Sequence, residues 1–183
     1  MKKRKINQNY LSLNVAILPS IVKGTSLSEE KQTIEFEVTE QLEEGEFFLF
    51  VNLDVKEGKV SKISPPLSSL KDLRNTSICD VLLIYKLPFS NSFIVVCFIE
   101  LKKTGDLEKI KDQIESTYST IFKKKNFIKL PYKPKFLCFY ASQKASPTNK
   151  NIKVEIEGKE LQLLPLRRHK NKFNIRDAIL KLI

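Results

Sequence analysis

Two strongly apolar segments near the middle of the chain dominate its hydrophobic pattern. They cover residues 78–85 and 93–101 and are apolar at almost every position, which is typical of central strands covered on both faces. Between them, residues 87–92 read Leu-Pro-Phe-Ser-Asn-Ser and are rich in turn formers. The pattern therefore predicts an antiparallel hairpin of two buried strands.

A helix is predicted directly after this hairpin. Its apolar residues recur at steps of three and four, as on one face of a helix, at Leu107, Ile110, Ile114, Tyr118 and Ile121. Asp106 stands where an N-cap is expected, and Glu108 lies in the first turn. Residues 135–141 then form a further buried strand. The predicted core order is strand, strand, helix, strand, and it spans residues 75–141.

Residues 33–63 read as a strand-rich meander. Apolar and polar residues alternate from Ile34 to Val38, residues 46–53 form a second apolar run, and a turn at Glu57-Gly58 leads into residues 59–63. A helix over residues 28–44 fits as well, because Ile34, Val38 and Leu42 are four residues apart. The pattern leaves that choice open.

Shorter elements complete the predicted fold. Ser68 or Ser69 is expected to cap a short helix that runs through Arg74. Residues 151–164 read as a hairpin about Glu157-Gly158, and residues 177–183 as a short closing helix. The whole chain, 1–183, is therefore expected to be one α/β (α+β) domain, with a mixed central sheet flanked by helices and extra strands at both ends.

Composition narrows the setting in which the protein works. The 183 residues are 42% hydrophobic and 29% charged, as in one globular domain. The longest apolar run, residues 93–99, is far shorter than the about 20 residues that span a bilayer, so no membrane partner is expected. The odd cysteine number and the lack of a C-x-x-C pair favour free buried thiols at Cys79, Cys97 and Cys138. Together these features predict a cytoplasmic protein.

The charge balance favours a polyanionic partner. The chain carries 32 Lys and Arg against 21 Asp and Glu, a net charge of +11, which predicts attraction to nucleic acid. A lysine-rich compositional bias is the alternative. His169 is the single histidine, and the five glycines are not spaced as a P-loop or dinucleotide fingerprint. Zinc sites, nucleotide hydrolysis and hydride transfer therefore lose support.

The hairpin brings two acidic residues together. If its turn is centred near Ser90, Asp80 lies opposite Glu100, with Cβ atoms roughly 5 Å apart, and like charges placed there repel. A divalent cation bound between the two carboxylates explains the arrangement, because Mg²⁺ prefers oxygen ligands. Lys102 points to the same face as Glu100, while Leu101 points away. An amine beside such a metal can orient water or stabilise charge on a phosphate.

Other interpretations of these residues stay open. A Glu-x-Lys triplet also begins at Glu29, Glu57 and Glu157, and Asp54-Val55-Lys56 follows a good apolar strand. Only Glu100-Leu101-Lys102 combines a buried strand, an acid on the adjoining strand and a capped helix directly after it. The bland alternative is that Asp80 satisfies a strand end while Glu100 and Lys102 form a surface ion pair.

These segments resemble the PD-(D/E)xK nuclease superfamily, which includes restriction endonucleases, junction resolvases and nucleases of phage defence. The resemblance rests on residues 79–84 (Cys-Asp-Val-Leu-Leu-Ile), 98–103 (Phe-Ile-Glu-Leu-Lys-Lys) and the helix that follows. It implies a restriction-endonuclease-like fold, metal binding by Asp80, Glu100 and the Leu101 carbonyl, and Lys102 as catalytic lysine.

The resemblance also implies further site residues. Gln113, on the helix after the motif, corresponds to a glutamine that often faces the active site, although a polar residue at the edge of a helix stripe is also ordinary. Cys79 stands where the family usually has proline. The acid that the family often carries on its first helix has three candidates, Glu37, Glu40 and Glu44.

The expected protein is a Mg²⁺- or Mn²⁺-dependent endonuclease. It would hydrolyse DNA, with RNA the second choice, by attack of water on a backbone phosphate. Because the chain has little room for a specificity domain, a homodimer or a subunit of a larger assembly is expected, acting in defence against phage or mobile DNA. The alternative is a catalytically inactive nucleic-acid-binding or scaffold subunit.

Basic residues at 167–170 and Lys172 are candidates for phosphate contacts. The alternative for this cluster is a solvated basic tail or a contact with a partner protein.

Overall fold

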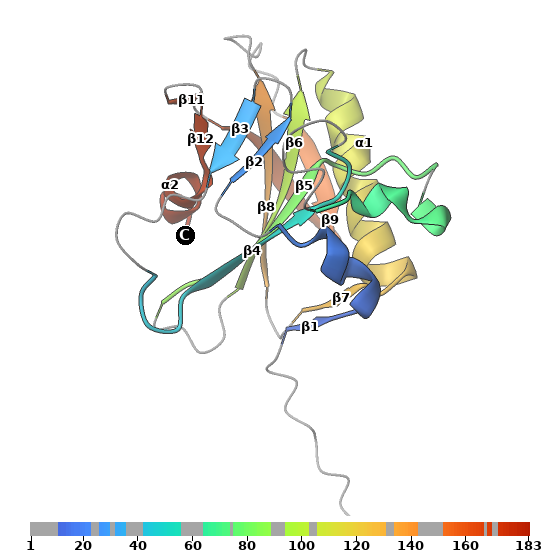
Figure 1. Ribbon diagram of the computed structural model, residues 1–183. Helices are drawn as coiled ribbons and strands as arrows, with labels where there is room; N and C mark the ends of the chain where they lie inside the picture. The colour runs from blue at the N-terminus through green and yellow to red at the C-terminus, as the bar shows by residue number, and fades with distance from the viewer. Residues whose placement is uncertain are drawn as a thin grey trace, which may run out of the picture.

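A six-stranded mixed sheet forms the centre of the protein in the computed structural model (Figure 1). The structure describes residues 11–22, 26–29, 32–35, 42–55, 64–73, 75–88, 94–102, 106–130, 134–142, 152–166, 168–169 and 172–183. In spatial order the strands are β4 (Phe47–Asn52), β5 (Val81–Lys86), β6 (Ile94–Lys102), β8 (Lys135–Ser142), β10 (Lys159–Pro165) and β9 (Lys153–Ile156). The fold is therefore α+β with a mixed sheet, as predicted at that level.

Strand directions change across this sheet. The β4–β5 and β5–β6 pairs are antiparallel, whereas β6–β8 and β8–β10 are parallel. The predicted hairpin, helix and strand appear as β5, β6, α1 (Leu107–Tyr118) and β8, and α1 makes the crossover that the parallel pair requires. The predicted order of the core is confirmed.

Side chains of alternating parity along β6 separate two cores. On one face Val96 and Phe98 pack with Ile110 and Ile114 of α1. On the other face Ile99 and its neighbours of the same parity pack with α2 (Ile175–Leu180). Figure 1 shows α1 and α2 on opposite sides of the sheet. Its central strands are thus buried on both faces, as their continuous apolar sequence predicts.

Helix α1 begins as the sequence indicates. The Asp106 side chain accepts a hydrogen bond from the Lys109 N–H at 3.3 Å, which makes it the N-cap. The helix continues as the π-helical segment η4 (Ser119–Lys124), and the apolar stripe of the prediction lies in the core. The closing helix α2 starts two residues earlier than predicted, because Asn174 caps it by accepting from the Asp177 N–H.

The β9–β10 hairpin turns as predicted about Glu157 and Gly158. Both residues have positive φ, 54° and 71°, which matches the right-handed twist of the flanking strands in a two-residue hairpin. Glycine adopts this conformation without a steric penalty, whereas Glu157 adopts it at a cost.

The prediction of one meander over residues 33–63 is wrong, because its strands belong to two sheets. A second sheet has the order β11-β12-β3-β2. It is built from β11 (Arg168–His169), β12 (Lys172–Asn174), β3 (Gln32–Glu35) and β2 (Ser26–Glu29). The helical alternative fails for the described part of 28–44, since β2 and β3 pair as strands. Residues 36–41 and the expected strand at 59–63 lie outside the described residues.

The short helix expected through Arg74 is replaced by two 3₁₀ turns, η2 (Leu67–Ser69) and η3 (Lys71–Leu73). Neither Ser68 nor Ser69 acts as the predicted cap: Pro66 holds the N-cap position of η2 and makes no side-chain capping bond. Proline presets its own φ, which suits the entry into such a turn. Arg74 lies outside the described residues.

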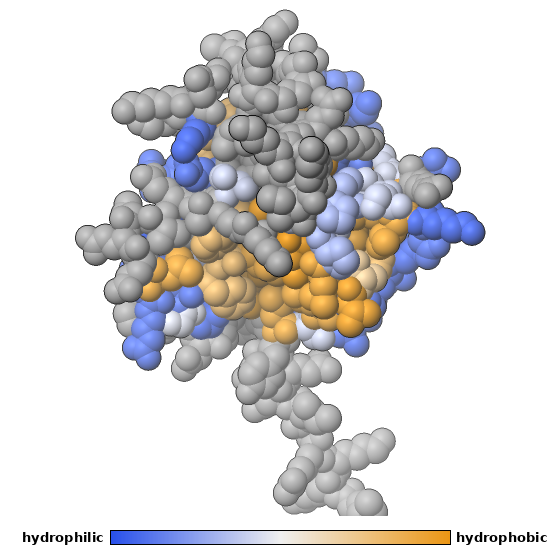
Figure 2. Space-filling view, in the orientation of Figure 1, coloured by the Kyte–Doolittle hydropathy of each residue, from blue (hydrophilic) through white to orange (hydrophobic). Residues whose placement is uncertain are grey.

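Apolar side chains gather on one face over β4 and the 3₁₀ helix η1 (Val15–Ser20), as Figure 2 shows. Val15 and Leu18 are 77% and 49% exposed there. Strand β4 is an edge strand, and Ile21 pairs with Val51 along its outer side. Nearby, the short strands β1 (Ser12–Leu13) and β7 (Ile128–Lys129) pair with each other. No helix in the described part of the chain is long and apolar enough to cross a bilayer.

Candidate functional site

Strands β5 and β6 pair in the register that the sequence predicts. Val81 lies opposite Ile99, and Leu82 opposite Phe98, which is the register centred on Ser90. One step further along this ladder, Asp80 comes opposite Glu100. The short turn between the strands sets this register, and a slip by one residue would move the Asp80 or Glu100 side chain to the other face of the sheet.

The side chain of each acidic residue accepts a backbone hydrogen bond from the other strand. The Leu101 N–H donates to Asp80 Oδ2 at 2.6 Å, and the Asp80 N–H donates to Glu100 Oε2 at 3.2 Å. Both residues are buried, with Asp80 6% and Glu100 1% exposed. The structure thus brings Asp80, Glu100 and the Leu101 backbone together at the end of the central sheet where β5 begins and β6 ends. The carboxylates also have a structural role, because they accept backbone N–H groups at the strand ends, as in the alternative interpretation that Asp80 satisfies a strand end.

Strand β4 ends at the same end of the sheet. The Asp80 carbonyl accepts hydrogen bonds from the N–H groups of Leu53 and Asp54, at 2.9 and 3.2 Å. Just before them, buried Asn52 binds both sides of the following loop, since its amide group donates to the Val55 and Ser64 carbonyls. The backbone of Asp80 is therefore held by the residues just after β4 on one side and by the Glu100 side chain of β6 on the other.

The remaining predicted residues differ in what the structure describes. Lys102 is the last residue of β6, opposite Ser142 of β8, but its side chain lies outside the description. The side chain of Leu101 packs into the core on the α2 face, as its parity predicts. Metal binding by the Leu101 carbonyl and the catalytic role of Lys102 stay predictions.

Gln113 lies on the buried side of α1, next to the segment that precedes Asp80, and is 8% exposed. Its Nε2 donates to the Ile78 carbonyl at 3.2 Å, two residues before Asp80. That Gln113 faces the active site, as the resemblance implies, stays a prediction. Its amide contacts the strand that carries Asp80.

Thr117 is a residue of this region that the sequence interpretation missed. Its hydroxyl donates to the Gln113 carbonyl at 2.6 Å and accepts from the Cys79 N–H at 2.8 Å. The side chain is fully buried. Its position four residues after Gln113, on the same helix face, is the signal that could have identified it.

The Cys79 thiol stays protonated. Burial raises its pKa well above the ordinary value, and although the hydrogen bond with Thr117 acts in the opposite direction, the charges of Glu100 and Asp80 raise it further. A thiol in such surroundings is neither a nucleophile nor a ready metal ligand. Cys79, Cys97 and Cys138 are all free and buried, as predicted.

The third acid that the resemblance implies is not among the described candidates. Glu44 lies in the turn before β4, and β4 starts opposite Lys86, at the far end of β5 from Asp80. That candidate is wrong because the six-residue length of β4 separates Glu44 from Asp80. Glu37 and Glu40 lie outside the described residues. Within the described part, no three His, Cys, Asp or Glu side chains are grouped to hold a metal ion.

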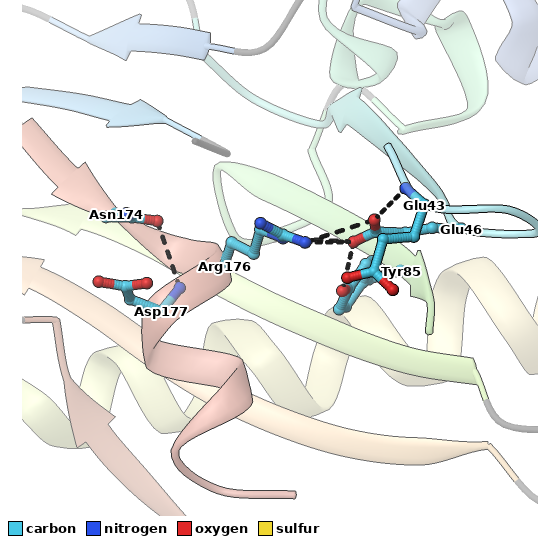
Figure 3. A network of polar contacts seen from close by, with 6 residues as sticks. All are labelled: Glu43, Glu46, Tyr85, Asn174, Arg176 and Asp177. Carbon is cyan, nitrogen blue, oxygen red and sulfur yellow. Dashed lines mark hydrogen bonds and ion pairs between the residues drawn. The ribbon is translucent and has the colours of Figure 1, made fainter. Parts of the chain in front are cut away.

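Another buried carboxylate, that of Glu46, was missed from the sequence (Figure 3). Its side chain is fully buried, and Arg176 of α2 makes an ion pair with it at 3.1 Å. The Tyr85 hydroxyl donates to Glu46 Oε1 at 2.6 Å, and the Glu43 N–H donates to Oε2 at 2.9 Å. Its one sequence signal is an acid directly before the apolar run of β4.

The Glu46 network is satisfied by its own members. Burial raises the pKa of the Glu46 carboxyl, but hydrogen bonds from Tyr85 and the Glu43 N–H and the charge of Arg176 outweigh burial, so the net pKa is lowered. Burial and the Glu46 carboxylate raise the pKa of Tyr85 to about 12. This network ties α2 to β4 and β5 on the face opposite α1.

The basic residues considered for phosphate contacts have little described geometry. Lys172 makes an ion pair with Glu35 at 2.8 Å within the second sheet. Arg168 and His169 form β11, but their side chains lie outside the description, as do residues 167, 170 and 171. The phosphate-contact hypothesis for this cluster stays a prediction.

Comparison of the chain with protein-family models, curated proteins and solved structures finds no significant match. Interpretation of the site therefore depends on its residues and their geometry.

Proposed function

We propose that this protein is a metal-dependent nuclease whose centre is formed by Asp80 and Glu100. The observation that carries the proposal is the convergence of two buried carboxylates where β5 begins and β6 ends. Side-by-side carboxylates repel, and burial strengthens that repulsion. A divalent cation between them would turn the repulsion into binding energy.

The donor set suits Mg²⁺ or Mn²⁺. Carboxylate oxygens are hard ligands, and Mg²⁺ is commonly bound in proteins by one or two carboxylates while water and substrate phosphate complete its shell. The thiol nearby is protonated and soft, which disfavours zinc. Asp80 and Glu100 would hold the ion, with the Leu101 carbonyl as the additional ligand that the resemblance implies.

Each residue has a distinct task in the proposed reaction. A divalent cation bound here supplies Lewis-acid activation of water and of the phosphoryl group. Lys102, two residues after Glu100 on the same strand, would place an ammonium beside the phosphate and stabilise the negative charge that develops there. Gln113 would maintain the strand before Asp80 through its bond to the Ile78 carbonyl.

The order of β5, β6, α1 and β8 supports a restriction-endonuclease-like arrangement, because the acids sit on adjacent antiparallel strands and the helix follows the second one. We infer DNA as the substrate, with RNA second, from the net charge of +11. A homodimer or a subunit of a defence complex would provide the target selection.

Cleavage of plasmid DNA and of labelled DNA and RNA oligonucleotides tests the proposal. Activity should require Mg²⁺ or Mn²⁺, stop with EDTA, and disappear in Glu100→Gln. That variant keeps the side-chain shape and an acceptor for the Asp80 N–H but loses the charge. Wild-type protein that neither binds Mn²⁺ in calorimetry nor cuts DNA or RNA would overturn it.

A catalytically inactive nucleic-acid-binding or scaffold subunit is the second candidate. One observation favours it: both carboxylates accept backbone hydrogen bonds from the neighbouring strand, which is a structural use. Such a protein would bind DNA equally well as wild type and as Glu100→Gln. Its affinity would also fall steeply with salt.

A further inference from the structure

Helix α1 holds the strand entrance, which is the segment Ile78 to Asp80 directly before β5. Two side chains of α1 reach it: Gln113 donates to the Ile78 carbonyl, and Thr117 accepts from the Cys79 N–H. Both bonds are buried, and both fall on residues directly before Asp80. The position of Asp80 therefore depends on the helix as well as on the sheet.

The Thr117 hydroxyl is oriented for this contact by its own helix. Its proton goes to the Gln113 carbonyl four residues earlier, a common bond for threonine in a helix. With the proton directed there, a lone pair is available to the Cys79 N–H at 2.8 Å. A buried backbone N–H requires an acceptor, so this hydroxyl determines where the Cys79 amide can lie.

From Cys79 a short chain of bonds leads to the acids. The peptide after Cys79 ends in the Asp80 N–H, which donates to Glu100 Oε2, and the Asp80 carboxylate accepts from the Leu101 N–H. A displacement of the Cys79 amide would shift both contacts together. Thr117 touches neither carboxylate in these bonds, so its influence on them passes through the backbone.

We propose that Thr117 is a positioning residue for the acidic pair, a role that presupposes the metal site proposed above. Its hydroxyl sets the strand entrance so that the Asp80 and Glu100 carboxylates converge. Such outer contacts typically change metal affinity by about 10- to 100-fold when removed. The claim concerns the hydroxyl group, because the methyl group of threonine can be supplied by valine.

Three variants of the full chain separate this role from general stabilisation. Thr117→Val keeps the shape and removes the hydroxyl, whereas Thr117→Ser keeps the hydroxyl. Thr120→Val is the matched control: Thr120 is also a buried threonine of the same continuous helix, and it lies in η4. Thr117→Ala, read by the same measurements, is the second variant should Thr117→Val not fold.

Two measurements are made on each variant. The first is Mn²⁺ affinity by calorimetry. The second is hydrogen exchange of the Leu101 amide by NMR, normalised to the Cys97 amide in the middle of β6. The normalisation removes the part of any change that reflects overall stability.

Thr117→Val should weaken Mn²⁺ binding about tenfold and speed normalised Leu101 exchange, while Thr117→Ser and Thr120→Val stay near wild type. Equal behaviour of Thr117→Val and Thr120→Val in both measurements would overturn the inference. If wild-type protein binds no Mn²⁺, the proposed function fails, and the exchange of Leu101 alone decides whether Thr117 positions Asp80.

Discussion

Two regions in the described part of the protein bury carboxylates, and they do so in opposite ways. On the α2 face, Glu46 meets a guanidinium and a phenol hydroxyl from other elements. On the α1 face, Asp80 and Glu100 come together, and each accepts a backbone N–H from the other strand. The first arrangement joins side chains of opposite charge, and the second places two acidic side chains next to each other.

This contrast separates stability from function. A buried carboxylate matched to an arginine holds elements together, and removing one partner leaves an uncompensated charge. Two neighbouring carboxylates repel each other, and under the proposed function a bound metal ion would make use of their charge. We therefore expect substitutions in the two regions to have opposite effects on stability and activity.

The largest effect is expected for Asp80→Asn and Glu100→Gln. Under the proposed function, each should reduce metal-dependent cleavage by more than about a hundredfold, because loss of a ligand should exceed loss of an outer contact. Each should also leave the free energy of unfolding unchanged or raise it by about 0.5 kcal/mol, since a like-charge repulsion is removed. Cleavage assays and urea unfolding measure the two quantities.

A loss of several kcal/mol of stability in both variants would break the comparison. It would mean that the acid pair serves the strand ends alone, as the structural interpretation of Asp80 has it. Circular dichroism of the folded variants controls for altered secondary structure.

Arg176→Met should have the next largest effect and act on stability. Methionine keeps most of the apolar stem but leaves Glu46 buried without the guanidinium, which costs about 3 kcal/mol. Urea unfolding followed by fluorescence or circular dichroism gives the value. Activity per folded molecule should not change, because the network lies on the opposite face of the sheet.

The double variant Arg176→Met with Glu46→Gln sharpens this prediction. Its loss of stability should be smaller than the sum of the single losses, because the second change removes the charge that the first one stranded. Strict additivity would show that Arg176 and Glu46 contribute independently.

Acid should weaken the Glu46 network in a defined range. The pKa of Glu46 is lowered in the folded protein from the ordinary value of 4.5, so its contribution to stability is complete above about that pH. The contribution is lost as pH falls through the lowered pKa. The free energy of unfolding, measured between about pH 6 and pH 3, should therefore fall more steeply for wild type than for Glu46→Gln. Parallel curves would show that Glu46 is not stabilised in its charged form.

The smallest effect is expected at an exposed ion pair. Lys125 and Asp72 lie 3.1 Å apart, with side chains 36% and 69% exposed. Solvent screens this pair, so Lys125→Met should change the free energy of unfolding by less than about 0.5 kcal/mol. A change as large as that of Arg176→Met would remove burial as the explanation of the contrast.

The parts of the site that the sequence could predict are local. Asp80 and Glu100 stand on two neighbouring strands joined by a short turn, so hydrophobic periodicity and the turn position determine their register. Gln113 was named from the resemblance to the nuclease superfamily, and the apolar stripe of α1 beside it, with Ile110 and Ile114, turns that side of the helix toward the sheet. Residue spacing along one or two elements carries the information on the acidic pair.

The missed residues depend on contacts between distant elements. Arg176 meets Glu46 from 130 residues away, and Thr117 meets Cys79 from 38 residues away. Nothing in the local pattern near these residues indicates their partners. Sheet membership is non-local too: strand patterning predicts β3 and β4 as strands, but pairing with β12 and β5 places them in different sheets.

The parallel β6–β8 pair has a consequence for how the molecule is made. Its strands are joined through α1, whereas β5 and β6 need only a short turn to meet. Contacts that close short loops form sooner than those that close long ones, and in a nascent chain the β5–β6 segment leaves the ribosome before α1 does. Asp80 and Glu100 are thus expected to approach each other before Thr117 is in place. Because salt screens the repulsion between charged carboxylates, the rate of hairpin formation at this early stage should depend on the salt concentration.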